Sequence, residues 1–226
     1  VNKATRRVKP MRSYASDIKY IGHGTQVIDP IDINGVLTLS EYKHEELLVL
    51  NENRFYYCPK CGYTVLDREN KTDIKIKAHK DYRGNDCDCP GNQLKLTHFG
   101  HRYNTDVVKI QFTGVTEMMD YEHALSTLYA LLEGISIAFD IERSDIGGMV
   151  IQSSPLKPFE FVLFDTVSGG AGHVKKLETK ENIMKALTAA NKIVSKCICD
   201  EDTSCYNCLK NFNNQRVHHH LKRGYA

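Results

Sequence analysis

Long apolar runs are missing from the sequence. No stretch of about eighteen consecutive apolar residues occurs, so we expect no transmembrane helix and no contact with a membrane. No secretory signal opens the chain, which favours a cytoplasmic location. The first residue is Val1 rather than Met, and we interpret this start as that of a processed chain or of a piece cut from a longer protein.

An excess of charge of one sign is also missing. The 30 Lys and Arg residues nearly balance the 28 Asp and Glu residues, which leaves a formal net charge of +2. Domains that bind nucleic acid over their whole surface are usually more basic than this, so any contact with DNA is expected from local patches. The basic segment 1–15 could form such a patch, but a solvated terminus is the favoured interpretation.

Glycine motifs that bind nucleotides are absent as well. The glycine-rich loop at residues 164–173 has neither the Gly-x-x-x-x-Gly-Lys-Ser/Thr pattern of a P-loop nor the Rossmann spacing, so ATP binding is not supported. The simplest interpretation is a sharp turn between a strand and a helix, in which Asp165 caps backbone amides. Two functional alternatives stay open. The amides of Gly169 and Gly170 could hold a DNA phosphate, or Asp165 and His173 could form the acid–base pair of a nuclease-like enzyme.

Cysteine, in contrast, is plentiful and clustered. The eight cysteines form two groups of four, each built from Cys-x-x-Cys or Cys-x-Cys pairs: Cys58, Cys61, Cys87 and Cys89, and then Cys197, Cys199, Cys205 and Cys208. Such pairs converge well on one tetrahedral metal ion and poorly on disulfides that close long loops. Because no export signal is seen, metal binding is favoured over disulfides.

The C-terminal cysteine group is the strongest signal in the sequence. Four thiolates within about twelve residues fill the coordination shell of tetrahedral Zn²⁺ and leave no open position, which predicts a structural ion. The ion is expected to pin the end of one helix to the start of the next and to supply much of the local folding free energy. An iron–sulfur cluster is the main alternative, because four thiolates also hold such clusters.

The N-terminal cysteine group predicts a second Zn²⁺ site of the zinc-ribbon type. The segment Cys58-Pro-Lys-Cys61-Gly62 has the form of a zinc knuckle, in which the glycine allows a tight backbone path after the second ligand. Cys87 and Cys89 would complete a site of four cysteines, which is the slightly favoured arrangement. His79 could replace one of them, and the sequence leaves both ligand sets open.

Basic residues follow the C-terminal cysteines. A basic cluster beside a rigid zinc knuckle can contact the phosphate backbone of DNA, although a merely solvated face fits equally well. The run His218-His219-His220 invites a metal site, but consecutive side chains on a helix point to different sides and cannot share one ion. The candidate nucleic-acid contacts are Lys210, Arg216, His218, Lys222 and Arg223, together with Gly169 and Gly170 of the glycine loop.

Periodicity predicts an α+β (or α/β) fold with a mixed sheet, two main amphipathic helices and zinc-stabilised lobes. Apolar residues recur at three- and four-residue steps over 119–139 and 181–195, as they do in amphipathic helices. Residues 94–98, 106–112 and 159–164 have the patterns of separate strands. We divide the chain into a β-rich or linker segment (1–54), a zinc-ribbon-like segment (55–105) and a zinc-binding domain (106–226).

Three motifs near the C-terminus share their spacing with one known family. They are Asp165-Thr-Val-Ser-Gly-Gly-Ala-Gly172, the four clustered cysteines, and Asn214-Gln215-x-x-His218-x-x-Leu221-x-Arg223. Together they closely resemble the MrfA-type zinc-binding domain, which ends a group of superfamily-two DNA helicases and occurs in DrmB-like proteins of bacterial anti-phage systems. The segments Cys58-x-x-Cys61-Gly62 and Phe99-Gly-His-Arg-Tyr103-x-Thr105-Asp106-Val107 are similar to the region upstream of that domain, so the resemblance covers about residues 55–226.

The resemblance implies that Cys197, Cys199, Cys205 and Cys208 ligate Zn²⁺. It also implies a non-catalytic accessory role for residues 106–226, which is to help a DNA helicase bind or orient DNA in DNA repair or anti-phage defence. Because the sequence has no Walker motif, we expect no enzymatic activity from this chain alone and predict helicase motor domains, in cis or in trans, as its partners. A nuclease-like enzyme around Asp165 and His173, and a protein-interaction module without direct DNA contact, are the alternatives.

Overall fold

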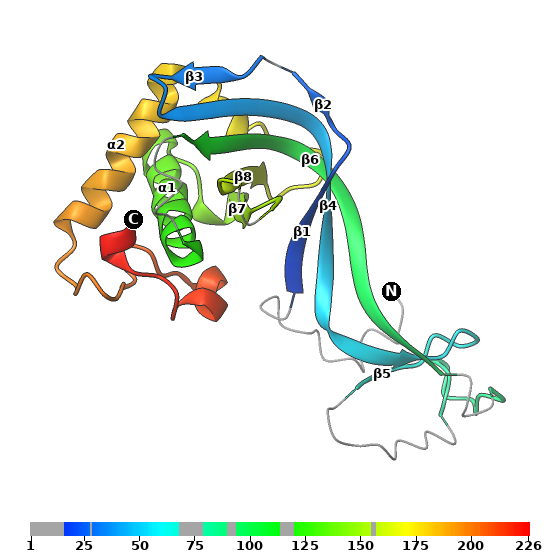
Figure 1. Cartoon of the computed structure of the whole chain (residues 1–226). Coiled ribbons are helices and arrows are strands. Elements are labelled where there is room, and N and C mark those ends of the chain that lie inside the picture. The colour runs from blue at the N-terminus through cyan, green and yellow to red at the C-terminus, as the bar shows by residue number, and fades with distance from the viewer. Residues whose placement is uncertain (1–15, 28, 68–78, 90–93, 114–119, 155–156) are drawn as a thin grey trace. The chain divides into compact units, whose positions relative to one another are not determined.

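The chain was analysed as a computed structural model, which describes residues 16–27, 29–67, 79–89, 94–113, 120–154 and 157–226. The basic segment 1–15 lies outside these residues. The chain forms two compact units (Figure 1). Unit 1 contains the described residues of the ranges 1–19 and 48–102, and unit 2 contains those of 20–47 and 103–226.

Eight strands are described, and three of them contribute residues to both units. They are paired in the order β1-β4-β6-β8-β7, with β2, β3 and β5 also on β4. The pairs of β2, β3 and β5 with β4, and of β8 with β6 and β7, are all antiparallel. The strands are β1 (Ser16–Gly22), β2 (Thr25–Gln26), β3 (Ile31–Ile33), β4 (Leu37–Tyr57), β5 (Thr64–Leu66), β6 (Lys95–Phe112), β7 (Ile146–Ile151) and β8 (Glu160–Asp165).

The two predicted amphipathic helices are both present in unit 2. Helix α1 (Tyr121–Phe139) begins at Asp120, whose side chain accepts a hydrogen bond from the backbone amide of His123, and ends where Asp140 adopts a left-handed conformation. Helix α2 (Lys180–Lys196) begins at Thr179, which caps the amide of Asn182 in the same way. Short 3-10 helices complete the unit: η4 (Arg143–Asp145), η5 (Val174–Leu177), η6 (Phe212–Val217) and η7 (Arg223–Tyr225).

The two helices pack directly against each other, and α1 also packs against the strand β7 (Figure 1). They approach closely at Gly134, where a Cβ atom would lie 2.7 Å from the amide nitrogen of Ala190 and would also collide with the carbonyl of Ala186. On the sheet side, a Cβ atom at Gly148 would meet Leu128 of α1 at 2.9 Å. These glycines allow backbone and side chains to approach closely, and the apolar stripe predicted from the sequence is thereby buried.

The α+β prediction is confirmed, with a sheet whose described registers are antiparallel. The two segments 94–98 and 106–112, which the sequence predicted as strands, belong to one strand, β6 (Lys95–Phe112). Gly100 does not interrupt β6 because it faces the neighbouring strand, where a Cβ atom would lie 2.7 Å from the carbonyl oxygen of Val49. None of the helices formed by the described residues is long and apolar enough to cross a membrane.

Candidate metal centres

The four C-terminal cysteines converge on one point at the end of α2. Their sulfur atoms all lie within 4.8 Å of one another. Cys197 Sγ is 3.5 Å from Cys199 Sγ and 3.4 Å from Cys205 Sγ, and Cys208 Sγ completes the group at 3.7 Å from Cys199 Sγ. Four sulfurs bound at about 2.3 Å to a tetrahedral Zn²⁺ are separated by about 3.8 Å, so this group fits the ion without rearrangement.

The same distances exclude the disulfide alternative for these residues. A disulfide joins two sulfurs at about 2.0 Å, whereas all eight cysteines of the chain are free thiols. Backbone amides instead point at the sulfurs: Cys205 N donates to Cys208 Sγ (3.2 Å) and Asn207 N donates to Cys205 Sγ (3.4 Å). Such donors stabilise thiolates and are typical of a metal knuckle.

The electrostatics of the group favour a cation at its centre. The backbone amide of Cys199, helped by hydrogen bonds from the other thiols, lowers the pKa of Cys197 to about 7. Burial raises the pKa of Cys208 to about 12. Without an ion, one thiolate therefore inhibits the ionisation of its neighbours, and a divalent cation is what allows all four to be charged together.

The segment that follows the cysteines packs against them. Arg223 Nε donates to the carbonyl oxygen of Cys199 (3.0 Å), and Ser204 Oγ donates to that of Leu221 (2.8 Å). Leu209 and Leu221 are buried in the core beneath the cysteines. The prediction that the cluster fastens the end of α2 to the following chain agrees with this arrangement.

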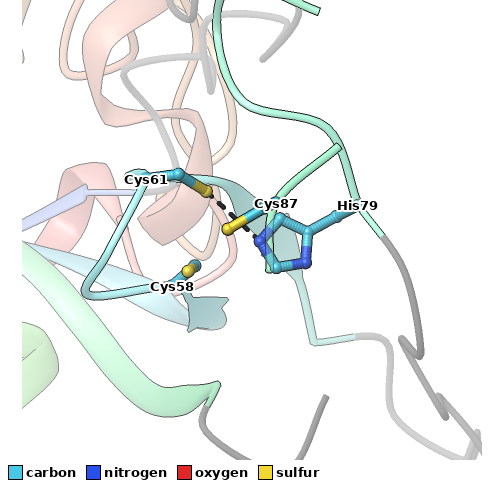
Figure 2. Close-up of side chains that lie close together, drawn as sticks. All are labelled: Cys58, Cys61, His79 and Cys87. Atoms are coloured by element: carbon cyan, nitrogen blue, oxygen red, sulfur yellow. Dashed lines mark hydrogen bonds between the residues drawn. The ribbon is translucent and has the colours of Figure 1, made fainter. Parts of the chain in front are cut away.

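A second convergent group lies in unit 1, where Cys58, Cys61, His79 and Cys87 face one another (Figure 2). Their ligand atoms also lie within 4.8 Å of one another, and His79 Nε2 is 3.2 Å from Cys61 Sγ. Burial raises the pKa of Cys58, but hydrogen bonds from the amides of Cys61 and Lys60 outweigh this effect and lower it to about 6. Three sulfurs and one imidazole nitrogen are a donor set that Zn²⁺ takes in closed structural sites.

Local backbone geometry brings each half of this second group together. In the Cys58 knuckle, Gly62 N donates to Cys58 O (2.9 Å) and Gly62 adopts a positive φ of 74°, as its role in the knuckle requires. On the other half, Cys87 N donates to His79 O (2.9 Å) across a tight turn. The Asp81 side chain holds that turn by accepting amide hydrogen bonds from Arg83 and Asn85.

Of the two ligand sets that the sequence left open, the structure assembles the one with His79 and corrects the slight preference for four cysteines. The turn places His79 directly opposite Cys87, so these two side chains meet the Cys58 knuckle together. Cys89 is two residues farther along, buried and hydrogen-bonded to Cys58, and its sulfur is outside the group of four. Sequence spacing alone does not reveal this choice, because it depends on the length of the turn.

The glycine loop is organised around a buried carboxylate. Asp165 ends β8 and is fully buried; its Oδ2 accepts amide hydrogen bonds from Ala171 (2.7 Å), Gly172 (2.6 Å) and His173 (3.2 Å). Its Oδ1 accepts a fourth from Val174 (3.0 Å). The capping role predicted for Asp165 is therefore confirmed, because this buried carboxylate accepts four backbone amides of the loop.

Neither functional alternative for the glycine loop agrees with its geometry. The amide of Gly169 donates to Asn104 O (2.7 Å) and that of Gly170 to Val167 O (3.0 Å), so these amides are not offered to a phosphate. The His173 imidazole faces Asp145, at 3.9 Å, rather than the carboxylate of Asp165. The structure therefore does not arrange Gly169 and Gly170 as the expected phosphate site requires, nor Asp165 and His173 as an acid–base pair requires.

The predicted nucleic-acid contacts differ in their exposure and in the groups that they contact. Three of them bond to named groups of the protein. Arg223 donates to backbone carbonyls, Lys222 Nζ is 2.8 Å from Glu122 Oε2, and His218 Nε2 is 2.7 Å from Asn214 Oδ1. Lys210 is half-buried and Arg216 is exposed. Counting basic residues could not reveal the contacts of Arg223 and Lys222, because their partners Cys199 and Glu122 are distant in sequence.

One feature that the sequence analysis missed is an apolar groove of about 1090 Å³ beside the C-terminal cysteines. It is bounded by the end of α1, the outer face of α2 and the cysteine knuckle. Two residues in the sequence could have indicated this groove: Met184, on the polar side of α2, and Ile198, between two cysteines. Both are large apolar residues that lie outside the core and are exposed.

Comparisons with known proteins agree with the motifs. Residues 127–209 match the family model of the MrfA Zn-binding domain. Druantia protein DruE of Escherichia coli (strain UMEA 4076-1) is 28% identical over 152 residues, which cover 60% of this chain and 8% of DruE. A crystal structure of the DUF1998 helicase MrfA bound to DNA is similar over 88% of this chain and 23% of that one, with a TM-score of 0.50 and 12% sequence identity. At this identity the likeness shows the fold alone, and the chain spans less than a quarter of the length of either protein.

Proposed function

Because residues 127–209 carry an MrfA Zn-binding domain, we propose that the chain is a non-catalytic, zinc-binding accessory part of a DNA helicase, or of a partner of one. In this role it helps to bind or orient DNA during DNA repair or anti-phage defence. The observation that carries the proposal is the convergence of Cys197, Cys199, Cys205 and Cys208 inside the matched domain. Motor domains in cis or in trans supply the ATP-driven step.

The role of the metal in this proposal is structural. Each group of four offers four protein ligands, so a bound Zn²⁺ has no open position for water or substrate. The C-terminal ion is held by Cys197, Cys199, Cys205 and Cys208, and the N-terminal ion by Cys58, Cys61, His79 and Cys87. Both ions hold short loop segments in one conformation, which is how a zinc knuckle presents a fixed surface.

DNA contact is assigned to Lys210 and Arg216, of which Arg216 is exposed and Lys210 is half-buried. Lys210 follows Cys208 by two residues, and Arg216 lies in η6, so both sit on the segment that the C-terminal site holds in place. Contacts of this kind neutralise phosphates and carry no sequence preference. His218, Lys222 and Arg223 support this segment from within rather than bind DNA themselves.

DNA binding by the zinc-loaded chain tests the proposal. Fluorescence anisotropy with labelled single- and double-stranded oligonucleotides is measured over a range of salt concentrations for the wild type and for K210A/R216A. We expect the double variant to bind more weakly at low salt, with a log–log salt slope smaller by about 1.5 to 2, because two phosphate contacts are lost. K157A/K176A, which removes two exposed lysines elsewhere in unit 2, is the matched control.

Two results would contradict this assignment. One is an absence of DNA binding by the zinc-loaded wild type at low salt. The other is equal binding by the wild type and K210A/R216A while the control variant is impaired, because the contact surface would then lie elsewhere.

A further inference from the structure

The apolar groove in unit 2 is built from three elements that meet at the C-terminal cysteines. Ile137 comes from the last turn of α1, Met184 and Ile193 come from α2, and Ile198 comes from the cysteine knuckle. Three of these four side chains are strongly exposed: Ile137 by 65%, Met184 by 43% and Ile198 completely. Single exposed apolar residues are ordinary, but several around one groove mark a surface that binds another molecule.

The backbone of the groove is rigid next to Ile198, its most exposed side chain. Ile198 lies between Cys197 and Cys199, whose sulfurs converge with those of Cys205 and Cys208. The Arg223 guanidinium also holds the carbonyl of Cys199 from the other side. A residue whose backbone is held in this way loses little backbone entropy on binding, which is a property of anchor residues in interfaces.

Positive charge runs along the rim of the groove. Lys185, Lys192 and Lys196 line it from α2 and are all exposed, while Glu181 is the single acidic residue among the described residues that line it. Lys185 keeps its ammonium 5.3 Å from the ring of Phe139. Lysines at these spacings follow one side of the helix, so a ligand in the groove meets an apolar floor and a basic edge.

The side chains that form the floor of the groove favour a protein ligand over a nucleic acid. Single-stranded nucleic acids bind grooves in which aromatic side chains stack on the bases. Among the described residues of this groove none is aromatic, and the floor consists of aliphatic side chains and methionine. An amphipathic helix with an aliphatic ridge matches such a floor, and acidic residues beside the ridge match the lysines.

We propose that this groove docks an acidic amphipathic helix of a partner protein. Aliphatic side chains of that helix pack on Ile137, Met184 and Ile198, and its carboxylates pair with Lys192 and Lys196. The surface is separate from Lys210 and Arg216, so docking does not depend on the DNA contact proposed above. It would give the chain a means of recruitment that operates whether or not DNA is bound.

A charge-swap experiment on the zinc-loaded full chain tests this proposal. The probes are two designed helical peptides with the same leucine ridge, one flanked by glutamates and the other by lysines, and a labelled oligo-dT serves as the nucleic-acid probe. Anisotropy is measured for the wild type, K192E/K196E and I198D. The matched controls are K157E/K176E and V167D, which make the same changes at exposed positions outside the groove.

We expect the wild type to bind the acidic peptide at least roughly tenfold more tightly than the basic one. K192E/K196E should reverse this preference, I198D should weaken both peptides, and the control variants should behave as the wild type. Equal affinity for the two peptides, or no saturable binding of the acidic one, overturns the proposal. Loss of oligo-dT binding in K192E/K196E without any acidic-peptide binding also overturns it and assigns the groove to nucleic acid.

Discussion

The guanidinium of Arg223 lies against the backbone of Cys199, with Nε donating a hydrogen bond to the Cys199 carbonyl oxygen at 3.0 Å. The same side chain donates through Nη1 to the carbonyl oxygen of Val194 (3.2 Å) near the end of α2, and only 16% of it is exposed. The last carbonyls of a helix have no partner within the helix, so Arg223 satisfies one of them while it holds the knuckle. A residue that looks like a DNA contact in the sequence is thus a structural one.

Replacement of Arg223 by Ala should therefore destabilise unit 2 without a direct effect on DNA. The loss of two hydrogen bonds from a charged donor to partly buried carbonyls is expected to lower the free energy of unfolding by about 2 kcal/mol. Thermal and denaturant unfolding of the zinc-loaded chain measure this, with R216A as the matched arginine control, expected within about 0.5 kcal/mol of wild type. Equal stability of R223A and R216A would show that the Arg223 contacts contribute nothing.

Metal content is the second prediction. The two groups of four predict two zinc ions per chain, as measured by inductively coupled plasma mass spectrometry on chain purified without chelator. Cys208→Ser and Cys61→Ser should each lower the content to about one, and C61S should leave the C-terminal ion in place because its ligands belong to another unit.

The choice between His79 and Cys89 is settled by the same measurement. His79→Ala should lose the N-terminal ion, whereas Cys89→Ser should keep both, since its sulfur lies outside the group of four. A zinc content of about one in C89S and about two in H79A would reverse the ligand assignment. An iron–sulfur cluster at either site would show as bound iron and visible absorption in anaerobically purified chain.

The third prediction concerns Asp165, whose carboxylate accepts four backbone amides of the glycine loop. Asp165→Ala leaves these amides without an acceptor in the interior and should cost about 3 kcal/mol or more in unfolding free energy. Asp145→Ala, which removes the exposed carboxylate near His173, is the control and should change little. Incubation with plasmid and Mg²⁺ or Mn²⁺ should give no cleavage, and cleavage abolished by D165A would contradict the capping role.

The fourth prediction is a pH dependence centred on Glu41. This carboxyl group is almost fully buried, and burial raises its pKa, as does the hydrogen bond with Glu178, while Lys43 and Lys175 partly oppose the shift. Because the folded chain holds this proton more tightly than the unfolded one, stability falls as pH rises from about 4.5 through the folded pKa. One carboxyl oxygen of Glu41 also has no hydrogen-bond partner among the described residues.

Glu41→Gln removes the ionisation and keeps the shape of the side chain. The variant is therefore expected to be more stable than wild type at alkaline pH, with the difference shrinking as the pH falls toward the ordinary carboxyl pKa of 4.5. Denaturant unfolding at several pH values, in zinc-containing buffer, measures this. A variant that is less stable than wild type at every pH would show that Glu41 makes a favourable charged contact instead.

Sequence patterns predicted those parts of the molecule whose geometry is local. The C-terminal cysteines span about twelve residues, so they can hardly avoid meeting, and the apolar period of α1 and α2 follows from helix geometry. The capping role of Asp165 was also a local inference, because the amides that donate to its carboxylate are close to it in the chain.

What the sequence could not supply depends on contacts between distant residues. Arg223 and Lys222 count as basic residues in the sequence, but their partners Cys199 and Glu122 lie 24 and 100 positions away. The continuous path of β6 through Gly100 depends on a neighbouring strand. In the same way, the exposure of Ile137, Met184 and Ile198 around one groove becomes visible only when α1, α2 and the knuckle are placed together.

The tail beyond residue 209 has a practical consequence. Tyr225 stacks on His123 of α1 at 3.7 Å, Lys222 N donates to Ser126 Oγ (3.0 Å), and Leu221 is buried in the core. The segment that matches the family model ends before Leu221, Lys222 and Tyr225, and begins just after His123 and Ser126. A fragment trimmed to that match would therefore expose apolar side chains of α1 that the tail covers. Expression of this unit should include the residues up to Ala226.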